Sequence, residues 1–360
     1  MIKTLKRGFR YIRNKKKSLT LRYYSLRYDK APVSNSSLKN VKSVALLRWD
    51  DKLGDAIMSG VFIKALCTYR PDISITVITP DFSARWYEKL NLCEVIRCDK
   101  RSKRTAFTFK QYRDRFDAVL DLGTSFSHKE LIALSMLNAQ HNIGFNKQGH
   151  PIFNHCLPPS AQHFKQRYLD AAKLFIDRIE NISIPLIPFD TNATLAPSLA
   201  SDYVAVNLYG SSKYRQFSET DAVTFLKKWL DSFPTDHIVL IPVPGKSEVL
   251  ERIVSTIASP NVVLPHNTPS LEFTLQLLSS CTLCFTPDTS VVHMASALNV
   301  PTLAVYADDP KNLDEWKPLS AENEVILNPK AKSLNDRVYV HQFEWDEFVS
   351  KRLALKNKLV

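Results

Sequence analysis

Short apolar runs alternate along this chain with longer stretches in which apolar residues recur at helical spacing. The runs at 44–47, 74–79 and 116–122 predict buried strands, and the stretches between them predict helices. Strands that alternate with helices in this way are typical of a parallel sheet covered by helices on both faces. We therefore predict an α/β domain that begins close to residue 41.

A second alternating set follows a Pro-rich stretch at 184–197, which predicts a linker between two domains. The chain of 360 residues is long enough for two cores of ordinary size. The predicted parts are an arm and linker at 1–40, a first domain at 41–190, a second domain at 191–342 and a C-terminal helix at 343–360 that packs back across the body.

The stretch 283–306, LCFTPDTSVVHMASALNVPTLAVY, predicts a complete βαβ unit. An apolar run leads into a turn at Asp288, Thr289 and Ser290, and a helical pattern and a second apolar run follow. This turn is expected at the carboxyl edge of the sheet, where open α/β folds bind ligands, and the N–H groups at the start of the helix suit a phosphate. A capped helix in an ordinary βαβ unit explains the same pattern, so both interpretations stay open.

Positive charge is concentrated at the N-terminus. The net charge is +12, and residues 1–40 contain twelve Lys or Arg against one acid, Asp29, which leaves about +1 for the remaining 320 residues. Because the body is nearly neutral, nucleic acid is not expected as a partner.

The basic arm also carries apolar residues at helical spacing. These are Ile2, Leu5, Phe9, Ile12, Leu19, Tyr23 and Leu26. A basic amphipathic helix of this kind is suited to an anionic membrane surface, which we expect residues 1–30 to contact. A disordered polar tail and a helix packed on the body are the alternatives.

Composition predicts a globular protein without a membrane span. Apolar residues make up 44% and charged residues 23% of the chain, and no apolar run is long enough to cross a bilayer. The N-terminus lacks the pattern of a secretory signal, and the six scattered cysteines suit free thiols in a reducing compartment. Cys281 and Cys284 form a C-x-x-C, but no second pair or nearby His cluster completes a metal site. We expect a cytoplasmic protein that uses no metal and no cofactor.

Three motifs together resemble glycosyltransferase family 9, the bacterial lipopolysaccharide heptosyltransferases. The first is Arg48-x-Asp50-x-x-Leu53-Gly54-Asp55, directly after the first predicted strand. The second is Asp288-Thr289-Ser290-x-x-His293, followed by Ala295, Ala297-Leu298 and Pro301-Thr302. The third is the loop 207–218, in which a basic residue precedes an aromatic residue and the start of a helix. The resemblance covers roughly residues 42–310.

The resemblance implies the GT-B fold, two Rossmann-like domains with parallel sheets facing a central cleft. It implies that the N-terminal domain binds the acceptor and the C-terminal domain binds a nucleotide sugar. The expected activity is inverting transfer of a heptose from ADP-heptose to the lipid A–core oligosaccharide, by an enzyme peripheral to the inner face of the inner membrane. Asp55 would be the base that takes the proton of the acceptor hydroxyl.

Further roles follow from the same resemblance. The residues expected to bind the donor are Lys213, Arg215, Glu272, Asp288, Thr289, Ser290 and His293. Those expected to bind the acceptor are Arg48, Asp50, Lys103 and Arg104. Without the motifs, Asp55 and Glu272 are ordinary helix first-turn acids, His293 is a structural histidine and the basic run 100–115 is a solvated loop.

The sequence departs from the family pattern in a few places. Ser290 replaces a glycine, Val61 stands where a proline is common, and Arg215 replaces a lysine. A transferase for another nucleotide sugar, a sugar-nucleotide epimerase and a non-catalytic, membrane-docked sugar-binding protein remain as alternatives.

Overall fold

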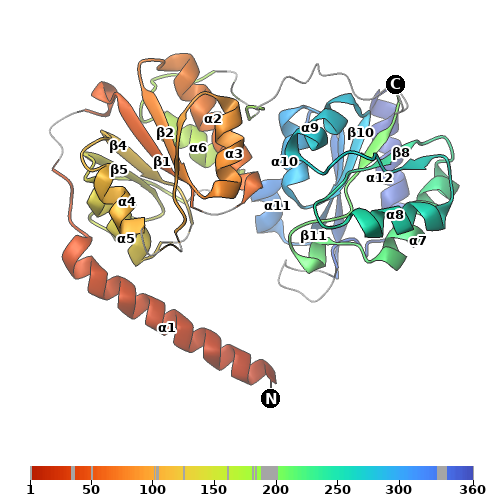
Figure 1. Ribbon diagram of the computed structural model, residues 1–360, viewed down its shortest axis with the longest axis horizontal. Helices are drawn as coiled ribbons and strands as arrows, with labels where there is room; N and C mark the ends of the chain where they lie inside the picture. The colour runs from red at the N-terminus through yellow and green to blue at the C-terminus, as the bar shows by residue number, and fades with distance from the viewer. Residues whose placement is uncertain are drawn as a thin grey trace. The chain divides into compact units, whose positions relative to one another are not determined.

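The computed structural model contains two compact units, each built around one parallel sheet with helices packed against it (Figure 1). The first unit comprises Met1–Ser160 and Lys165–Ile182, and the second comprises Ala161–Phe164 and Ser183–Val360. The structure describes residues 2–33, 37–49, 52–100, 102, 105–124, 126–159, 162–180, 182, 185–187, 202–330 and 339–359. Most of the predicted linker at 184–197 therefore lies outside the described residues.

The first unit has a six-stranded sheet in the order β3-β2-β1-β4-β5-β6. Its elements are α1 (Ile2–Tyr28), the 3-10 turn η1 (Leu38–Asn40), β1 (Ser43–Leu47), α2 (Leu53–Tyr69), β2 (Ser74–Thr79), α3 (Asp81–Leu90), β3 (Glu94–Arg97), α4 (Thr105–Gln111), β4 (Ala118–Asp121), α5 (His128–Leu137), β5 (His141–Phe145), β6 (His155–Leu157) and α6 (Phe164–Ala172). Every strand pair is parallel; in the centre, Val44 pairs with Ile75 of β2 on one side and Ala118 of β4 on the other.

The second unit repeats this architecture with the order β12-β11-β10-β7-β8-β9. Its elements are β7 (Val204–Val206), the 3-10 turn η2 (Lys213–Arg215), α7 (Glu219–Ser232), β8 (Ile238–Leu240), α8 (Ser247–Ile257), β9 (Val262–Val263), α9 (Leu271–Ser280), β10 (Leu283–Pro287), α10 (Ser290–Ala297), β11 (Thr302–Ala307), α11 (Pro310–Trp316), β12 (Asn323–Asn328) and α12 (Trp345–Leu359). These strands are also all parallel. The prediction of two Rossmann-like domains is confirmed.

The strand order fixes where a ligand site is expected. In each sheet the direction of winding reverses between the first and the fourth strand, β1 beside β4 and β7 beside β10. At such a switch point the loops that follow the two strands diverge and leave room at the carboxyl edge for a ligand. The loops after β1, β7 and β10 contain the three sequence motifs.

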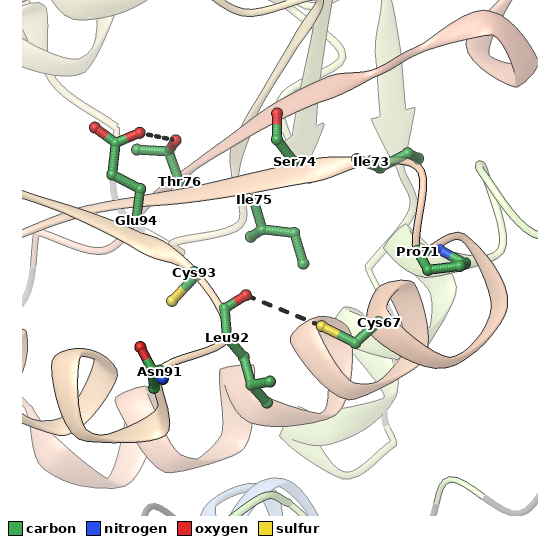
Figure 2. A pocket seen from close by; sticks show the side chains of 10 residues that line it. All are labelled: Cys67, Pro71, Ile73, Ser74, Ile75, Thr76, Asn91, Leu92, Cys93 and Glu94. Carbon is green, nitrogen blue, oxygen red and sulfur yellow. Dashed lines mark hydrogen bonds between the residues drawn. The ribbon is translucent and has the colours of Figure 1, made fainter.

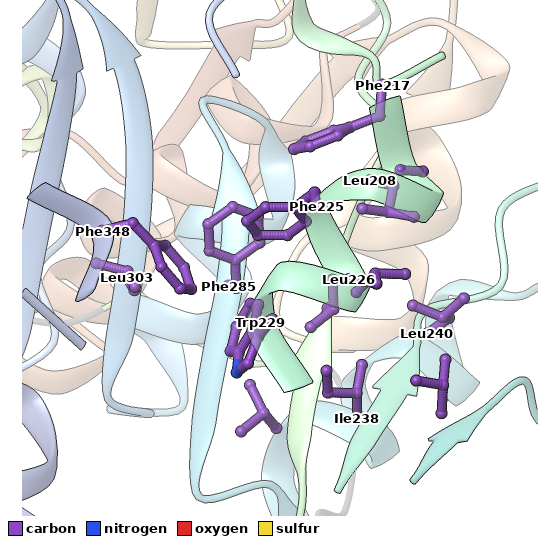
Figure 3. Packing of buried hydrophobic residues seen from close by; sticks show 14 of the residues in the cluster. Leu208, Phe217, Phe225, Leu226, Trp229, Ile238, Leu240, Phe285, Leu303 and Phe348 are labelled. Atoms are coloured by element: carbon purple, nitrogen blue, oxygen red, sulfur yellow. The ribbon is translucent and has the colours of Figure 1, made fainter. Parts of the chain in front are cut away.

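An aromatic cluster fixes the C-terminal helix to the second unit (Figure 3). Phe348 of α12 lies 4.8 Å from the ring of Trp229 and 5.9 Å from that of Phe285, both of which are fully buried. Arg352, one turn further on, donates to both carboxylate oxygens of buried Asp236 at 3.0 and 3.1 Å. The helix is thus held by apolar packing and by a buried ion pair.

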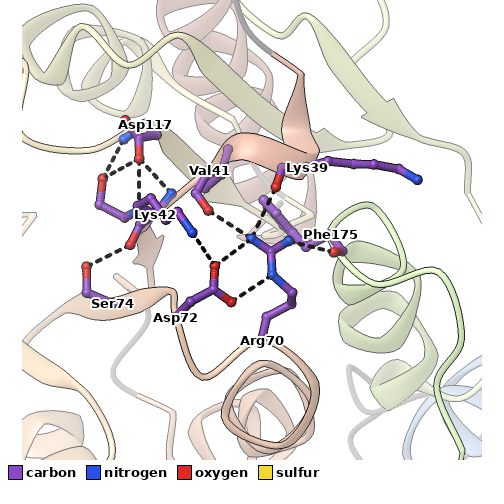
Figure 4. Close-up of polar contacts among 9 residues, drawn as sticks. Lys39, Val41, Lys42, Arg70, Asp72, Ser74, Asp117 and Phe175 are labelled. Carbon is purple, nitrogen blue, oxygen red and sulfur yellow. Dashed lines mark hydrogen bonds and ion pairs between the residues drawn. The ribbon is translucent and has the colours of Figure 1, made fainter.

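Polar contacts anchor the beginning of β1 (Figure 4). The Asp117 carboxylate accepts from the N–H groups of Lys42 and Ser43 at 2.8 and 2.9 Å. Arg70, at the end of α2, donates to the carbonyl oxygens of Val41 and Phe175 at 3.2 and 3.0 Å. These bonds fix the start of the strand whose other end leads into the Arg48–Asp55 motif.

Several elements differ from the sequence-based expectation. The basic run 100–115, for which the sequence offers a solvated loop, contains α4, and the sequence does not predict the strands β5, β6 and β12. Phe109 of α4 is buried against the sheet, so one face of this basic segment belongs to the core. The strand β5 has the sequence HNIGF. Its polar residues do not predict a buried strand, yet all five residues are buried.

Candidate functional site

The turn between β10 and α10 is built around a threonine cap. Thr289 has an extended backbone, and its side-chain oxygen accepts from the N–H of Val291 at 3.2 Å. Ser290 is the first helical residue and does not adopt a positive φ, so the turn accepts its Cβ without backbone strain. The first N–H groups of a helix lack partners within it, which makes this end of α10 suitable for an anion.

A hydrogen-bonded triad joins the ends of the two switch-point strands. Asn207, directly after β7, donates from Nδ2 to the Oγ1 atoms of Thr286 at 2.9 Å and of Thr289 at 3.1 Å. The two threonine oxygens lie 3.1 Å apart. Because Asn207 is fully buried, this triad fixes the cap of α10 relative to the loop that leaves β7.

Arg215 lies beside the same turn. Its Nη1 donates to the carbonyl oxygen of Asp288 at 2.8 Å, and its Nη2 lies 3.6 Å from the Asp288 carboxylate. Asn312 of α11 donates to that carboxylate at 3.0 Å. Burial raises the pKa of Asp288, while Arg215 and then Asn312 act in the opposite direction. Asp288 is thus the anchor that holds the guanidinium at the turn.

The Arg215 guanidinium retains donor capacity. Its Nε is buried and has no hydrogen-bond partner among the described residues, and the side chain is 22% exposed. An orphaned, charged N–H is costly unless a ligand or water satisfies it. The position of this donor next to a helix N-terminus fits the oxygen of a phosphate.

His293 is a neutral neighbour of this group. It is buried, and its ring centroid lies 5.5 Å from that of Trp316. Burial, together with the smaller effects of the nearby charges of His163 and Arg215, lowers the pKa of His293 to about 3. Its Nδ1 has no partner within the described part of the chain. At neutral pH the ring therefore offers a hydrogen bond and no charge.

Two further residues are predicted to bind the donor, Glu272 and Lys213. Glu272 is a half-buried residue in the first turn of α9, whose cap is Ser270. Lys213 is exposed, with its Nζ 5.1 Å from the ring centroid of Tyr214. Arg215, two residues later, is the cation of this loop that contacts Asp288.

In the first unit, the structure brings Arg48 and Asp55 together. Arg48 follows β1 directly, and its N–H donates to the carbonyl oxygen of Ile78 at 2.9 Å. Its Nη2 lies 3.4 Å from Oδ1 of Asp55 in the first turn of α2, and the two side chains are only 3% and 10% exposed. Asp50, Lys103 and Arg104 lie outside the described residues.

Sequence reasoning did not identify a second buried pair at this sheet edge. Lys147, after β5, lies 2.7 Å from the carboxylate of Asp121 at the end of β4, and both side chains are nearly inaccessible. Burial raises the pKa of Asp121, and Lys147 opposes that shift. The sequence assigns no role to Asn207, although it begins the loop 207–218, or to Asn312, because each acts through a contact distant in sequence.

A hollow of about 500 Å³ lies elsewhere on the first unit (Figure 2). It is lined by the end of α2 and by β2 and β3, with Cys67, Cys93 and Glu94 among its residues. Burial raises the pKa of both thiols, that of Cys93 to about 12, so neither is an activated nucleophile. None of the predicted site residues lines this hollow.

The described residues contain no group of three or more His, Cys, Asp or Glu side chains placed to hold a metal ion. No helix among them combines the length and apolar character needed to span a membrane.

Comparisons with known proteins agree with the motifs. Residues 236–344 match the model of glycosyltransferase family 9 (heptosyltransferase). No protein of curated function matches the chain by sequence. Among solved structures, ADP-heptose lps heptosyltransferase II of E. coli is 18% identical, with a TM-score of 0.63 over 88% of this chain and 99% of that one. A family 9 glycosyl transferase from Veillonella parvula is 15% identical, with a TM-score of 0.66 over 90% and 100%. E. coli heptosyltransferase WaaC with ADP is 16% identical, with a TM-score of 0.63 over 88% and 98%.

At these identities the solved structures show a shared fold, and the family match lies in the second unit, around the turn of Asp288. The match confirms the resemblance that the motifs predict. The chain is a glycosyltransferase of the GT-B fold, with a family 9 segment at residues 236–344.

Proposed function

We propose that this glycosyltransferase moves a heptose from ADP-heptose to the core oligosaccharide of lipopolysaccharide, with inversion at the anomeric carbon. One observation carries the proposal: the buried Nε of Arg215, which has no partner among the described residues, lies beside the N-terminus of α10. Structures of similar fold include an E. coli heptosyltransferase with ADP and the same enzyme with ADP-2-deoxy-2-fluoro heptose.

The donor half of the proposal rests on charge. As the bond between the anomeric carbon and the diphosphate breaks, negative charge develops on the departing oxygen. Arg215 and the N–H groups of α10 would stabilise it, because they are held in position before the reaction begins. His293 would add a hydrogen bond to the donor without a second positive charge. In this proposal, groups of the protein itself stabilise the negative charge on the departing diphosphate.

Asp55 would act on the acceptor. The acceptor oxygen attacks the anomeric carbon, ADP leaves with the electron pair of the broken bond, and the hydroxyl proton passes to the Asp55 carboxylate. A single displacement inverts the configuration and needs no covalent sugar–enzyme intermediate. Arg48, whose Nη2 lies 3.4 Å from Asp55, would orient that carboxylate.

The proposed setting is the cytoplasmic face of the inner membrane. The lipid A–core acceptor is embedded in that membrane, and the basic N-terminal arm provides a positively charged contact with its surface. No role for nucleic acid is proposed.

The donor is tested by thermal stabilisation with ADP, UDP, GDP and CDP and with their sugars. A ligand at 100 times its Kd stabilises the folded state by about 2.7 kcal/mol, which is easily measured. We expect ADP and ADP-heptose to give the largest shifts. Stabilisation by UDP-sugars and not by ADP would reject the proposed donor.

The mechanism is tested with Asp55→Ala, which should abolish transfer and leave ADP binding unchanged. Asp81→Ala is the matched control, because Asp81 is also a first-turn acid but is 80% exposed on α3. Full transfer by Asp55→Ala contradicts the role of base. Conversion of the nucleotide sugar without acceptor would indicate an epimerase, and donor binding without any turnover a sugar-binding protein.

A further inference from the structure

The N-terminal arm forms one long helix, α1, of 27 residues. At about 1.5 Å per residue it is about 40 Å long. Its C-terminal part contacts the first unit through Leu21, Tyr24 and Tyr28, which pack against the core cluster that includes α5.

Specific contacts fix this end of the helix. The ring of Tyr24 stacks on that of His128 with the centroids 5.1 Å apart. Directly after the helix, the Asp29 carboxylate accepts from the N–H of Ile152 at 3.0 Å and lies 2.7 Å from Nδ1 of His150. The rotation of α1 about its axis is therefore set, and so is the face that it turns away from the domain.

The outward face of α1 combines apolar and basic side chains. Leu19, Tyr23 and Leu26 are 59%, 71% and 84% exposed and, at spacings of four and three residues, lie on one side of the helix. Exposed cations flank this stripe at Lys15, Lys16, Arg22 and Arg27. We call these seven residues the outer face. A cluster of large exposed apolar residues on a fixed helix marks a contact surface.

We propose that the outer face lies on an anionic lipid bilayer, with Leu19, Tyr23 and Leu26 inserted among the headgroups and the flanking cations against the lipid charges. This inference rests on the proposed function in one respect, because an enzyme that acts on a lipid-linked acceptor works at a membrane surface. It goes further in naming the helix face that makes the contact.

Charge selects the bilayer over a second copy of the chain. Two outer faces packed together would bring eight cations into one interface, and like charges repel strongly when water is excluded. The one acid of residues 1–40, Asp29, contacts His150 and the N–H of Ile152 and does not neutralise the face. Anionic lipid supplies the missing negative charge, and its headgroup region accepts leucine and tyrosine side chains.

Vesicle co-sedimentation of the full chain tests the proposal. We expect binding to vesicles of phosphatidylcholine with 30% phosphatidylglycerol, and little binding to phosphatidylcholine alone. The double variant Arg22→Gln/Arg27→Gln should bind about fivefold more weakly for each charge removed. Leu19→Ser/Leu26→Ser should weaken binding by about tenfold for each leucine.

Two controls match these variants. Leu353→Ser removes a leucine that is 44% exposed on α12, and Arg85→Gln removes an exposed arginine of α3. Both should bind vesicles as the wild type does. Failure of the wild type to bind anionic vesicles overturns the proposal, and so does equal binding by the outer-face variants. A dimer that dissociates when Leu19 and Leu26 are replaced, without vesicle binding, also overturns it.

The same variants separate this inference from the proposed function. Transfer to a soluble core oligosaccharide should keep its wild-type rate in Leu19→Ser/Leu26→Ser, since no lipid is involved. Vesicle binding without any transferase activity rejects the proposed function alone. Transferase activity without vesicle binding rejects the docking face alone.

Discussion

Gly210 allows the loop after β7 to approach the turn of α10 closely. A Cβ at this position would lie 2.8 Å from Cγ2 of Thr289 and 3.1 Å from Cβ of Arg215. The glycine cannot easily withdraw, because its N–H donates to the carbonyl of Arg215 at 3.0 Å and its carbonyl accepts from the Gln216 side chain at 2.6 Å. Gly210→Ala must therefore displace the cap of α10, the Arg215 backbone or both.

The expected cost follows from these contacts. Overpacking a tight site by one methyl group costs about 1–3 kcal/mol, and loss of a helix cap costs about 1 kcal/mol. In a domain of this size each kcal/mol lowers Tm by about 2–4 °C. Because Thr289 caps α10, and Arg215 and the N–H groups of α10 are proposed to contact the diphosphate, Gly210→Ala should also weaken ADP binding, by about tenfold or more.

Differential scanning fluorimetry and calorimetric titration with ADP measure the two effects. Gly149→Ala is the neutral control, since a Cβ there would lie within 4 Å of no other described residue apart from its two chain neighbours. Gly144→Ala is the stability control: Gly144 and Phe153 both belong to the first unit, and the new Cβ would lie 2.7 Å from the Phe153 ring. It should lower Tm and leave ADP affinity unchanged. If Gly210→Ala matches Gly149→Ala in both Tm and ADP affinity, our account of the donor turn is wrong.

Three further predictions concern buried or partly buried ionisable side chains, those of Arg215, His293 and Arg352. Arg215→Lys keeps the charge and loses the planar group, so ADP affinity should fall about tenfold by calorimetry; an unchanged Kd would show that Arg215 does not bind the diphosphate. Since burial lowers the pKa of His293 to about 3, the unfolded chain binds a proton below about pH 6.5 that the folded chain excludes. The stability owed to neutral His293 is therefore complete above pH 6.5 and falls as the pH drops towards 3. Between pH 7 and pH 4.5, the free energy of unfolding measured with urea should fall less for His293→Gln than for the wild type. Arg352→Met strands the buried Asp236 carboxylate and should cost about 3–5 kcal/mol, whereas Arg252→Met, at an exposed pair, should change urea unfolding little; equal losses would refute the buried-pair argument.

The sequence predicts the central strands because they are rich in apolar and β-branched residues. β1, β2, β7 and β10 are covered on both faces, and such strands read as continuous apolar runs. β5 and β12 escape prediction because His, Asn or Glu interrupts their apolar pattern. The arm was predicted as a helix from its periodicity, but only the structure shows that Leu21 and Tyr24 face the domain.

The candidate site is predictable where a motif is local. Asp288 follows β10 directly, Asp55 lies in the first turn of the helix after β1, and each belongs to a recognisable spacing. The resemblance puts Arg215 at the position of the family's lysine, with Lys213 as a near alternative. The structure adds that Arg215, at the end of the 3-10 turn η2, is the side chain that contacts Asp288. Asn312 lies 24 residues beyond Asp288, in a helix that was not predicted, so its contact depends on tertiary structure alone.

The cysteines have a practical consequence for studying the outer face. Burial raises the pKa of all six thiols, including Cys281 to about 12, so the native cysteines are protonated and slow to alkylate at neutral pH. The Tyr23 side chain is 71% exposed, so the thiol introduced by Tyr23→Cys should react with a maleimide dye much faster than the native thiols. An environment-sensitive fluorophore at that position would report immersion in lipid directly, in a chain that keeps its native thiols.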